Sequence, residues 1–273
     1  MVLVTGATGN QGGAVVDALL HTGAWTVRAL TRDPAGPAAR ALTERGVAVV
    51  AGDLADPASL RAAMSGAHGV FSVQNSRTAG RTGEVRQGTN VVDAAIATGV
   101  RHLVYSSVGG AERVRGIPHF DTKWEIERHL AGTGLTWTVL RPTTFTSVFT
   151  MRGAGAGLSL MATALGPAGT LQMIAVTDIG VFARLAFERP GQFAGQALEL
   201  AGDELGVAQI AETLRDAGRR IRYTRRLPKS VLRMIGPEAR MLSWFGESGY
   251  AADIPALRRI HPGLLTLDRW LRA

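Results

Sequence analysis

The sequence contains no cysteine, and only two of its 30 basic residues are lysine, at positions 123 and 229. Without thiols there are no disulfides, cysteine nucleophiles or cysteine-ligated metals, and we expect no metal site. The arginines give a net charge of +8, but they are not gathered on one helix with interleaved aromatic residues. The charge allows loose affinity for polyanions, and we expect no specific nucleic-acid partner.

We also expect no segment that serves export or membrane insertion. We expect a strand from residue 2 onward, which leaves no room for a signal peptide. Residues 153–177 carry no charge, but five glycines and a proline make this stretch a poor membrane span. It fits the lining of an apolar pocket better, and we expect a cytoplasmic protein with no membrane partner.

What the sequence does contain at its start is a short apolar run, a glycine-rich turn and an apolar-periodic segment. Glycines at positions 6, 9 and 12 predict a tight turn between a strand and a helix. Backbone N–H groups at such a helix start favour an anion, here a dinucleotide pyrophosphate. The alternative is a turn without a ligand. The predicted binding residues are Gly6, Ala7, Thr8, Gly9, Asn10, Gln11 and Gly12.

Short apolar runs alternate with helix-like segments through the first half of the chain. We interpret as strands residues 2–4, 25–30, 47–51, 69–73, 103–106 and 136–140. Helices are expected between them, for example 57–65, with Asp56 as N-cap and Pro57 in the first turn. The alternation predicts an α/β fold with a doubly wound parallel sheet of the Rossmann type. A ligand then lies outside the carboxyl ends of the strands.

The rhythm breaks after Pro142. Strands are expected at 171–175, 197–200 and 221–224, and helices at 178–187 and 207–217. We therefore predict a dinucleotide-binding domain over 1–142. Residues 143–273 are predicted to form a smaller α+β substrate or lid region, interleaved with the sheet.

An acidic residue is missing where the second strand ends. NAD-preferring sites use such a residue on the ribose 2′-hydroxyl, whereas Arg32 stands here and can hold a 2′-phosphate. This favours NADP(H) over NAD, unless Arg32 is only one more surface arginine. Asp53, after the third strand, is placed to face the adenine amino group, or it is an ordinary loop aspartate.

The chain also lacks a tyrosine–lysine pair at four-residue spacing, which many hydride-transferring enzymes of this architecture use. His119 and Lys123 have that spacing instead. Lys123 can donate to the nicotinamide ribose and stabilise charge on a substrate oxygen, and His119 can deliver a proton. The alternatives are a solvated lysine and a structural histidine. The choice of lysine in a chain that otherwise uses arginine favours the cofactor contact for Lys123.

Several segments together resemble the NmrA-like family of atypical short-chain dehydrogenases, most closely its HSCARG-type NADPH-sensor branch. The resemblance extends over nearly the whole chain, and it is carried by residues 6–13, 28–34, 102–107, 119–123 and 265–271. It implies a Rossmann domain with a small C-terminal region and NADP(H) as cofactor. Beyond the glycine turn, Arg32 and Lys123, it adds as cofactor-contacting residues Asp53, Leu54, Gln74, Asn75, Ser76, Phe145, Thr146, Ser147 and Val148.

Two departures from the sensor branch bear on function. The segment between Ser107 and His119 is shorter, and residues 145–148 lack the polar pair of that branch, which suggests a drier nicotinamide pocket. The family contains NADPH-dependent reductases of quinones, enones and carbonyl-like compounds, and also non-catalytic NADPH/NADP⁺ sensors that regulate a protein partner. We favour a reductase of a small apolar acceptor, with a redox sensor as the alternative. A homodimer stays open.

Overall fold

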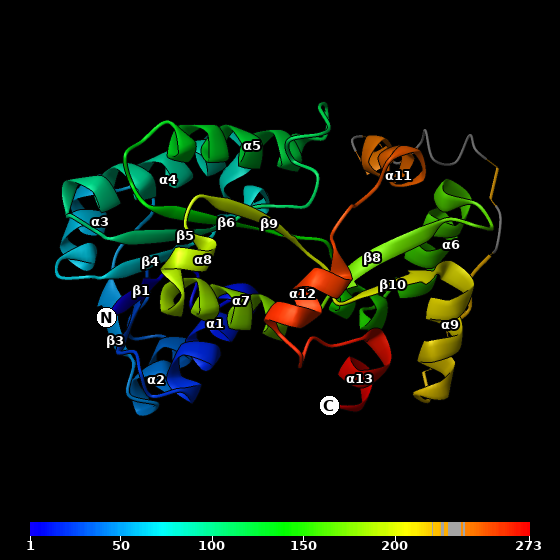
Figure 1. The fold of residues 1–273 in the computed structure, drawn as a ribbon, viewed down its shortest axis with the longest axis horizontal. Coiled ribbons are helices and arrows are strands. Elements are labelled where there is room, and N and C mark those ends of the chain that lie inside the picture. Colours follow the sequence, from blue (N-terminus) through cyan, green and yellow to red (C-terminus); the bar gives the residue numbers. More distant parts are fainter. Residues whose placement is uncertain (220, 225–226, 229–235, 237) are drawn as a thin grey trace. The chain divides into compact units, whose positions relative to one another are not determined.

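The computed structural model describes residues 1–219, 221–224, 227–228, 236 and 238–273 (Figure 1). The chain divides into two compact units, each made of separate segments. Unit 1 comprises Met1–Ser107, Thr122–Leu140 and Ile179–Leu198, and unit 2 comprises Val108–Asp121, Arg141–Asp178 and Glu199–Ala273. The predicted domains, a dinucleotide-binding domain over 1–142 and a smaller substrate or lid region over 143–273, stay a prediction.

Unit 1 is built on a seven-stranded sheet with the order β3-β2-β1-β4-β5-β6-β9. The strands are β1 (Val2–Val4), β2 (Val27–Thr31), β3 (Ala48–Ala51), β4 (Gly69–Ser72), β5 (His102–Ser106), β6 (Trp137–Pro142) and β9 (Gln196–Leu200). The pairs from β3 to β6 are parallel. The chain runs outward from β1 in both directions, so the predicted doubly wound Rossmann topology is confirmed.

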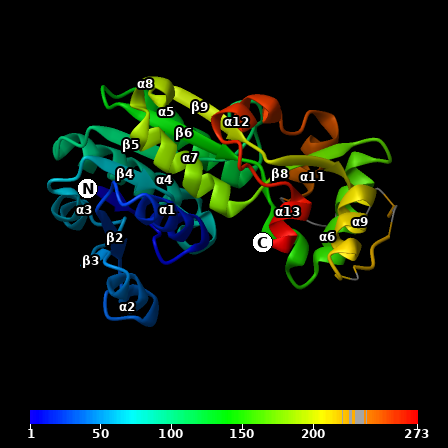
Figure 2. The same cartoon turned by 60° about the horizontal axis from the view of Figure 1, so that its bottom comes forward.

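Helices cover both faces of this sheet (Figures 1 and 2). One face has α3 (Pro57–Met64), α4 (Ser76–Ala97) and α5 (Pro118–Ala131), and the other has α1 (Asn10–His21) and α7 (Val176–Glu188). Unit 1 also contains α2 (Pro37–Glu44) and α8 (Pro190–Phe193). The N-cap of α3 is as predicted, since the Asp56 carboxylate accepts a hydrogen bond from the backbone N–H of Ala58 at 2.9 Å.

Burial explains why the central strands are rich in apolar residues. Every residue of β1, β4 and β5 is buried, because helices cover both faces of the sheet. The edge strand β3 is partly exposed. One core cluster joins β1, β4 and β5 to α3, α4 and α5, with Leu3, Met64, Val91, Tyr105 and Ile126 among its members. This packing holds the carboxyl ends of the strands rigidly.

Unit 2 contains a three-stranded sheet in the order β10-β8-β7. Its strands are β7 (Thr144–Phe145), β8 (Thr170–Ile174) and β10 (Asp203–Gly206), and its helices are η1 (Thr146–Thr150), α6 (Ala154–Leu165), α9 (Val207–Asp216), α11 (Glu238–Glu247), α12 (Ile254–Ile260) and α13 (Leu267–Arg272). Its core contains Phe120, Phe149, Met173, Ile210 and Trp244. Of the helices in the described ranges, none is long and apolar enough to cross a membrane.

The strand predicted at 221–224 is wrong. This segment has no strand pairing and runs beside α6, where side-chain hydroxyls take the place of a neighbouring strand. The Thr224 N–H donates to the Ser159 hydroxyl at 2.9 Å, and the Leu227 N–H donates to the Thr163 hydroxyl at the same distance. Backbone groups near a helix surface can be satisfied in this way, which the apolar pattern of the segment does not reveal.

Candidate functional site

The glycine turn after β1 forms a cradle that no larger residue fits. Gly6 has φ of 61°, a left-handed conformation that favours glycine. A Cβ on Gly12 would lie 2.2 Å from the Gly6 carbonyl oxygen and 2.7 Å from that of Thr5. The first turn of α1 therefore packs directly on the loop backbone. Helix α1 then begins at Asn10, with Gly9 as an N-cap that supplies no side-chain hydrogen bond.

This arrangement fits a dinucleotide pyrophosphate. The uncapped start of α1 offers backbone N–H groups and a partial positive charge. Gly6, Thr8, Gly9 and Asn10 are exposed, while Ala7 and Gly12 are buried beneath them. Gln11 is held by a residue of β5, because its Oε1 accepts a hydrogen bond from the Ser106 hydroxyl at 2.6 Å. The predicted turn residues are thus brought together, and their role in binding stays a prediction.

The residues after β2 and β3 have less specific environments. Arg32 directly follows β2 and is exposed, which suits a 2′-phosphate contact and equally a surface arginine. The Asp53 carboxylate accepts a hydrogen bond from the Ala55 N–H at 2.8 Å, as an ordinary loop aspartate does. Leu54 packs against the sheet core, and its carbonyl accepts a hydrogen bond from the Asn90 side chain at 3.0 Å. Both alternatives raised for Arg32 and Asp53 remain compatible with the structure.

The segment after β4 has one feature that a ligand can satisfy. Gln74 is 5% exposed, and its Nε2 donates to the Ser72 hydroxyl at 2.9 Å. Its Oε1 is buried and accepts no hydrogen bond within the described ranges. A buried acceptor without a partner costs free energy, which a bound donor would recover. Asn75 caps α4 through the Arg77 N–H, and Ser76 is the first residue of that helix.

Lys123 is not a solvated surface lysine. Its side chain is 13% exposed, and its ammonium lies 3.0 Å from the Glu84 carboxylate and 3.3 Å from the Gln74 carbonyl oxygen. The ammonium also lies 5.9 Å from the ring centre of Tyr105. An ammonium has three N–H donors, and the third has no acceptor in the part of the chain that the structure describes. Lys123 is thus held in place with one donor available.

Sequence reasoning missed the carboxylates behind this lysine. Glu84 on α4 is 1% exposed, and Glu127 on α5 is 4% exposed and accepts a hydrogen bond from the Ser107 hydroxyl. Burial, followed by the charges of Glu84 and Glu127, raises the pKa of Tyr105 well above its ordinary value. Tyr105 is 1% exposed and is a neutral residue of the core. Glu84 stands between Arg81 and Arg86 on α4 and reads as one more charged residue of a solvated helix face, so no local pattern marked it.

His119 and residues 145–148 belong to unit 2. His119 is partly buried near the start of α5, and its ring packs edge-to-face on Phe120 with centres 4.8 Å apart. Phe145 ends β7, and Thr146, Ser147 and Val148 open the 3-10 helix η1. Thr146 is 1% exposed, and its hydroxyl has no hydrogen-bond partner among the described residues. The nicotinamide-side roles of these five residues stay predictions.

The uncharged stretch of unit 2 is mainly core. Met173 is fully buried and Met161 packs on the same cluster, as its partly buried neighbours do. Just before this stretch, Met151 is 62% exposed and lines a cavity of about 280 Å³, whose lining also includes Gly153, Arg219 and Arg222. Two arginines make this cavity polar rather than apolar, and Met161 and Met173 serve packing.

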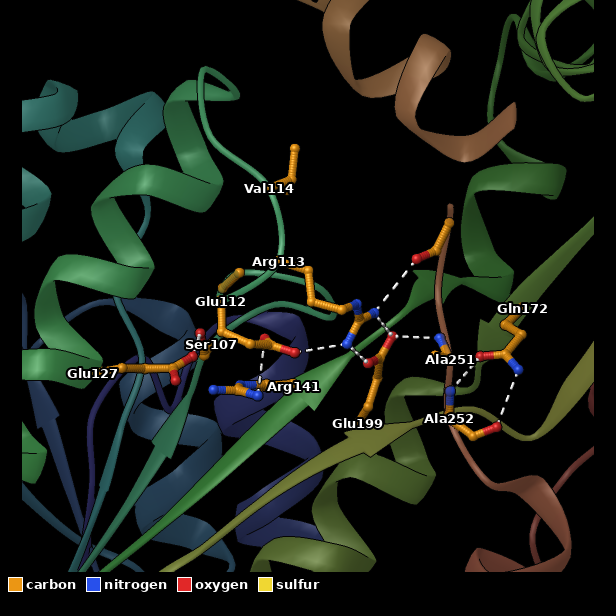
Figure 3. Close-up of polar contacts among 12 residues, drawn as sticks. Ser107, Glu112, Arg113, Val114, Glu127, Arg141, Gln172, Glu199, Ala251 and Ala252 are labelled. Atoms are coloured by element: carbon orange, nitrogen blue, oxygen red, sulfur yellow. Dashed lines mark hydrogen bonds and ion pairs between the residues drawn. The ribbon is translucent and has the colours of Figure 1, made fainter. Parts of the chain in front are cut away.

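A second polar network, in unit 2, fixes the chain around residues 249–252 (Figure 3). The Arg113 guanidinium binds both oxygens of Glu199, at 2.9 and 3.1 Å, and also Glu112 at 2.6 Å. Glu199 in turn accepts a hydrogen bond from the Ala251 N–H at 2.9 Å. The Gln172 amide pairs with both backbone groups of Ala252. These contacts join distant segments of unit 2 to one another.

Comparisons with known proteins agree with this geometry. The model of the NmrA-like family matches residues 1–262. The fungal NmrA-like family domain-containing oxidoreductase FrzB from Cladobotryum sp is 37% identical over 141 residues, which cover 47% of this chain and 41% of FrzB. This chain therefore spans less than half the length of FrzB. Quinone oxidoreductase 2 from Escherichia coli is 30% identical over 228 residues, 82% of this chain and 77% of that enzyme.

Solved structures also resemble this chain over nearly its whole length. The crystal structure of the Escherichia coli NADPH-dependent quinone oxidoreductase with NADPH has a TM-score of 0.82 at 26% identity, covering 100% of this chain and 99% of that one. The Citrobacter sp. triphenylmethane reductase with NADP(H) has a TM-score of 0.81 at 21% identity, covering 99% and 98%, which supports the fold alone. The NADPH of the quinone oxidoreductase complex agrees with the NADP(H) prediction. On the family match across residues 1–262, the chain belongs to the NmrA-like family.

Proposed function

We propose that this chain binds NADP(H) and uses it to reduce a small, apolar acceptor, such as a quinone, an enone or a related carbonyl compound. The likeness to quinone oxidoreductase 2 carries the choice of reaction, since it extends over 77% of that enzyme. The glycine cradle, the open acceptor of Gln74 and the available donor of Lys123 support the cofactor. Residues 1–142 take the cofactor in this proposal, and 143–273 the acceptor.

Bound NADPH supplies the hydride. The backbone N–H groups from Gly6 to Gly12 hold the pyrophosphate, and Arg32 holds the 2′-phosphate. The Lys123 ammonium donates to a nicotinamide ribose hydroxyl and places positive charge where the acceptor oxygen becomes negative. His119 or solvent adds the proton. A quinone needs no dedicated acid, because hydride uptake followed by protonation from water gives the hydroquinone.

Turnover decides between this proposal and the redox sensor. Purified protein is mixed with NADPH and a panel of quinones, enones and aldehydes, and NADPH oxidation is followed by absorbance. The proposal predicts oxidation well above buffer with at least one apolar acceptor. NADPH binding without turnover on the whole panel contradicts the reductase and favours the sensor. Failure to bind NADPH at all contradicts both.

The cofactor preference has its own test. Arg32→Ala should weaken NADPH binding about tenfold and leave NADH binding unchanged, because only NADPH carries the 2′-phosphate. Arg101→Ala is the matched control on another exposed arginine of unit 1. Equal loss for NADPH and NADH, or no loss for either, would show that Arg32 does not hold that phosphate.

A further inference from the structure

Two helices of unit 1 approach each other closely at a glycine. A Cβ on Gly88 of α4 would lie 2.4–2.9 Å from three side-chain carbons of Ile126 on α5. The close approach therefore requires glycine at this position. Glu84 lies one turn before Gly88 on α4, and Thr122 lies one turn before Ile126 on α5. Glu84 therefore lies on the same face of α4 as Gly88, and Thr122 on the same face of α5 as Ile126. Gly88 thus brings a carboxylate of α4 to the turn of α5 that carries Lys123.

The carboxylate of Glu84 is fully engaged at this point. One oxygen lies 3.0 Å from the Lys123 ammonium, and the other accepts a hydrogen bond from the Thr122 hydroxyl at 2.5 Å. With 1% of the residue exposed, Glu84 has almost no water to solvate its charge. A buried carboxylate persists only when it is paired and hydrogen-bonded, and here both requirements are met by adjacent residues of α5.

The contact restricts where the ammonium can point. A lysine side chain is flexible, and holding it costs rotamer entropy. Glu84 and the Gln74 carbonyl together fix two of the three N–H directions, which leaves one direction for a ligand. The site thus needs a compact ammonium rather than a planar guanidinium, which explains lysine at this position in an arginine-rich chain.

We infer that Glu84 is the positioning residue of the cofactor site, holding the Lys123 ammonium so that its remaining N–H meets the nicotinamide ribose hydroxyls. This inference rests on the proposed function, because the ribose belongs to NADP(H). Glu84 acts through Lys123 and makes no contact of its own with the cofactor. Thr122 supports it by binding the second carboxylate oxygen.

A double-mutant cycle on the full chain tests this inference. NADPH dissociation constants are measured by fluorescence titration for wild type, Glu84→Gln, Lys123→Met and the double variant. Glu84→Gln should weaken NADPH binding about tenfold, and it should add nothing once Lys123 is gone. The same loss on both backgrounds would show that Glu84 acts on the fold rather than on the lysine, and would overturn the inference.

Recovery by a conservative variant gives a second readout that a structural role does not move. Glu84→Asp keeps the carboxylate charge beside the Lys123 ammonium, so it should keep part of the NADPH affinity that Glu84→Gln loses. Equal loss of NADPH affinity in the two variants contradicts the inference. Where Glu84→Gln fails to fold, Thr122→Val replaces it, since this change removes the hydrogen bond to the second carboxylate oxygen of Glu84 and should give a smaller loss of the same kind.

Glu188→Gln is the matched control. It makes the same change in the Arg184–Glu188 pair of unit 1, which lies on α7 with an N–O distance of 2.6 Å. NADPH affinity should stay at the wild-type value. If wild type binds NADPH and Glu84→Gln binds equally well, the inference fails and the proposed function stands. If wild type does not bind NADPH, the proposed function itself fails.

Discussion

Each unit of this chain contains an ion pair around a largely buried glutamate, and the two pairs use different cations. In unit 1, Glu84 is paired with Lys123, and in unit 2, Glu199 is paired with Arg113. The glutamate side chains are 1% and 9% exposed, respectively. The Arg113 guanidinium donates hydrogen bonds to Glu112, to both carboxylate oxygens of Glu199 and to the Gly249 carbonyl. The lysine keeps one donor uncommitted among the described residues.

In our proposal this difference separates a structural pair from a pair that serves binding. The planar guanidinium of Arg113 binds a carboxylate with two parallel hydrogen bonds, and four of its five N–H donors are used in holding segments together. The aromatic cluster around Trp244 and Tyr250 packs beside it, with ring centres 5.2 Å apart, and Gly109 leaves no room for a Cβ against Tyr250. The compact ammonium of Lys123 is held in place, but one of its N–H donors has no acceptor among the described residues. In our proposal this donor binds the cofactor.

The largest effect should come from a change in the glycine turn after β1, because our proposal places the cofactor pyrophosphate there. Gly12→Ala forces a Cβ into backbone 2.2 Å away, so α1 must move from the loop. We expect NADPH affinity to fall by about a thousandfold, close to 4 kcal/mol, in a titration. Gly157→Ala is the control, because a Cβ there meets nothing within 4 Å. Wild-type affinity in Gly12→Ala would remove the cradle from the cofactor site.

The buried base His102 extends the comparison to a third ionisable group. His102 is 3% exposed, and its Nε2 lies 2.8 Å from the Thr138 hydroxyl, which itself donates to the Phe193 carbonyl. Burial, with a smaller contribution from His68, lowers the pKa of His102 to about 4. The folded state therefore keeps His102 neutral at a pH where the unfolded chain is already protonated.

Stability should fall as the pH falls. Between the ordinary histidine pKa of 6.5 and about 4, the unfolded state binds a proton that the native state does not, so the free energy of unfolding decreases. The total loss from His102 is about 3 kcal/mol, and it levels off below its folded pKa. Urea unfolding at a series of pH values measures the slope. His102→Gln should flatten it, and an unchanged slope would assign the acid sensitivity elsewhere.

Breaking the unit 2 pair should affect stability alone. Arg113→Ala removes both hydrogen bonds from the guanidinium to Glu199, so the free energy of unfolding should drop by about 2 kcal/mol, reduced from the value for a fully buried pair because the arginine side chain is 34% exposed. Chemical denaturation measures the loss. NADPH affinity, measured on the folded variant, should remain near the wild-type value. A tenfold loss of affinity without loss of stability would reverse the roles that we assign to the two pairs.

The smallest change tests the cation itself. Lys123→Arg keeps the charge beside Glu84, so the fold should retain its stability, but the larger fork cannot occupy the place of the ammonium. We expect NADPH binding to weaken about tenfold, close to 1.4 kcal/mol, in the same titration. Arg184→Lys is a control exchange in the opposite direction on an ion pair of α7. Full NADPH affinity in Lys123→Arg would make the choice of lysine incidental.

The sequence by itself determined the sheet and the location of the glycine turn after β1. Burial on both faces makes β1 an entirely apolar strand, and backbone geometry requires glycine at positions 6 and 12, so both features are visible in the residue order. Local signals failed at 221–224, where hydroxyls of α6 satisfy the backbone and no strand forms. A pattern of apolar residues does not record such partners.

Only the tertiary structure decided what surrounds Lys123. The sequence marked this lysine by its rarity, but Glu84 lies 39 positions away along the chain and meets it because Gly88 lets two helices pack closely. It likewise placed Met173 and Met161 in a core where the uncharged stretch suggested a pocket lining. Charge pairing and burial depend on the packing of whole elements, and residues distant in sequence contribute to them equally, so no local pattern specifies them.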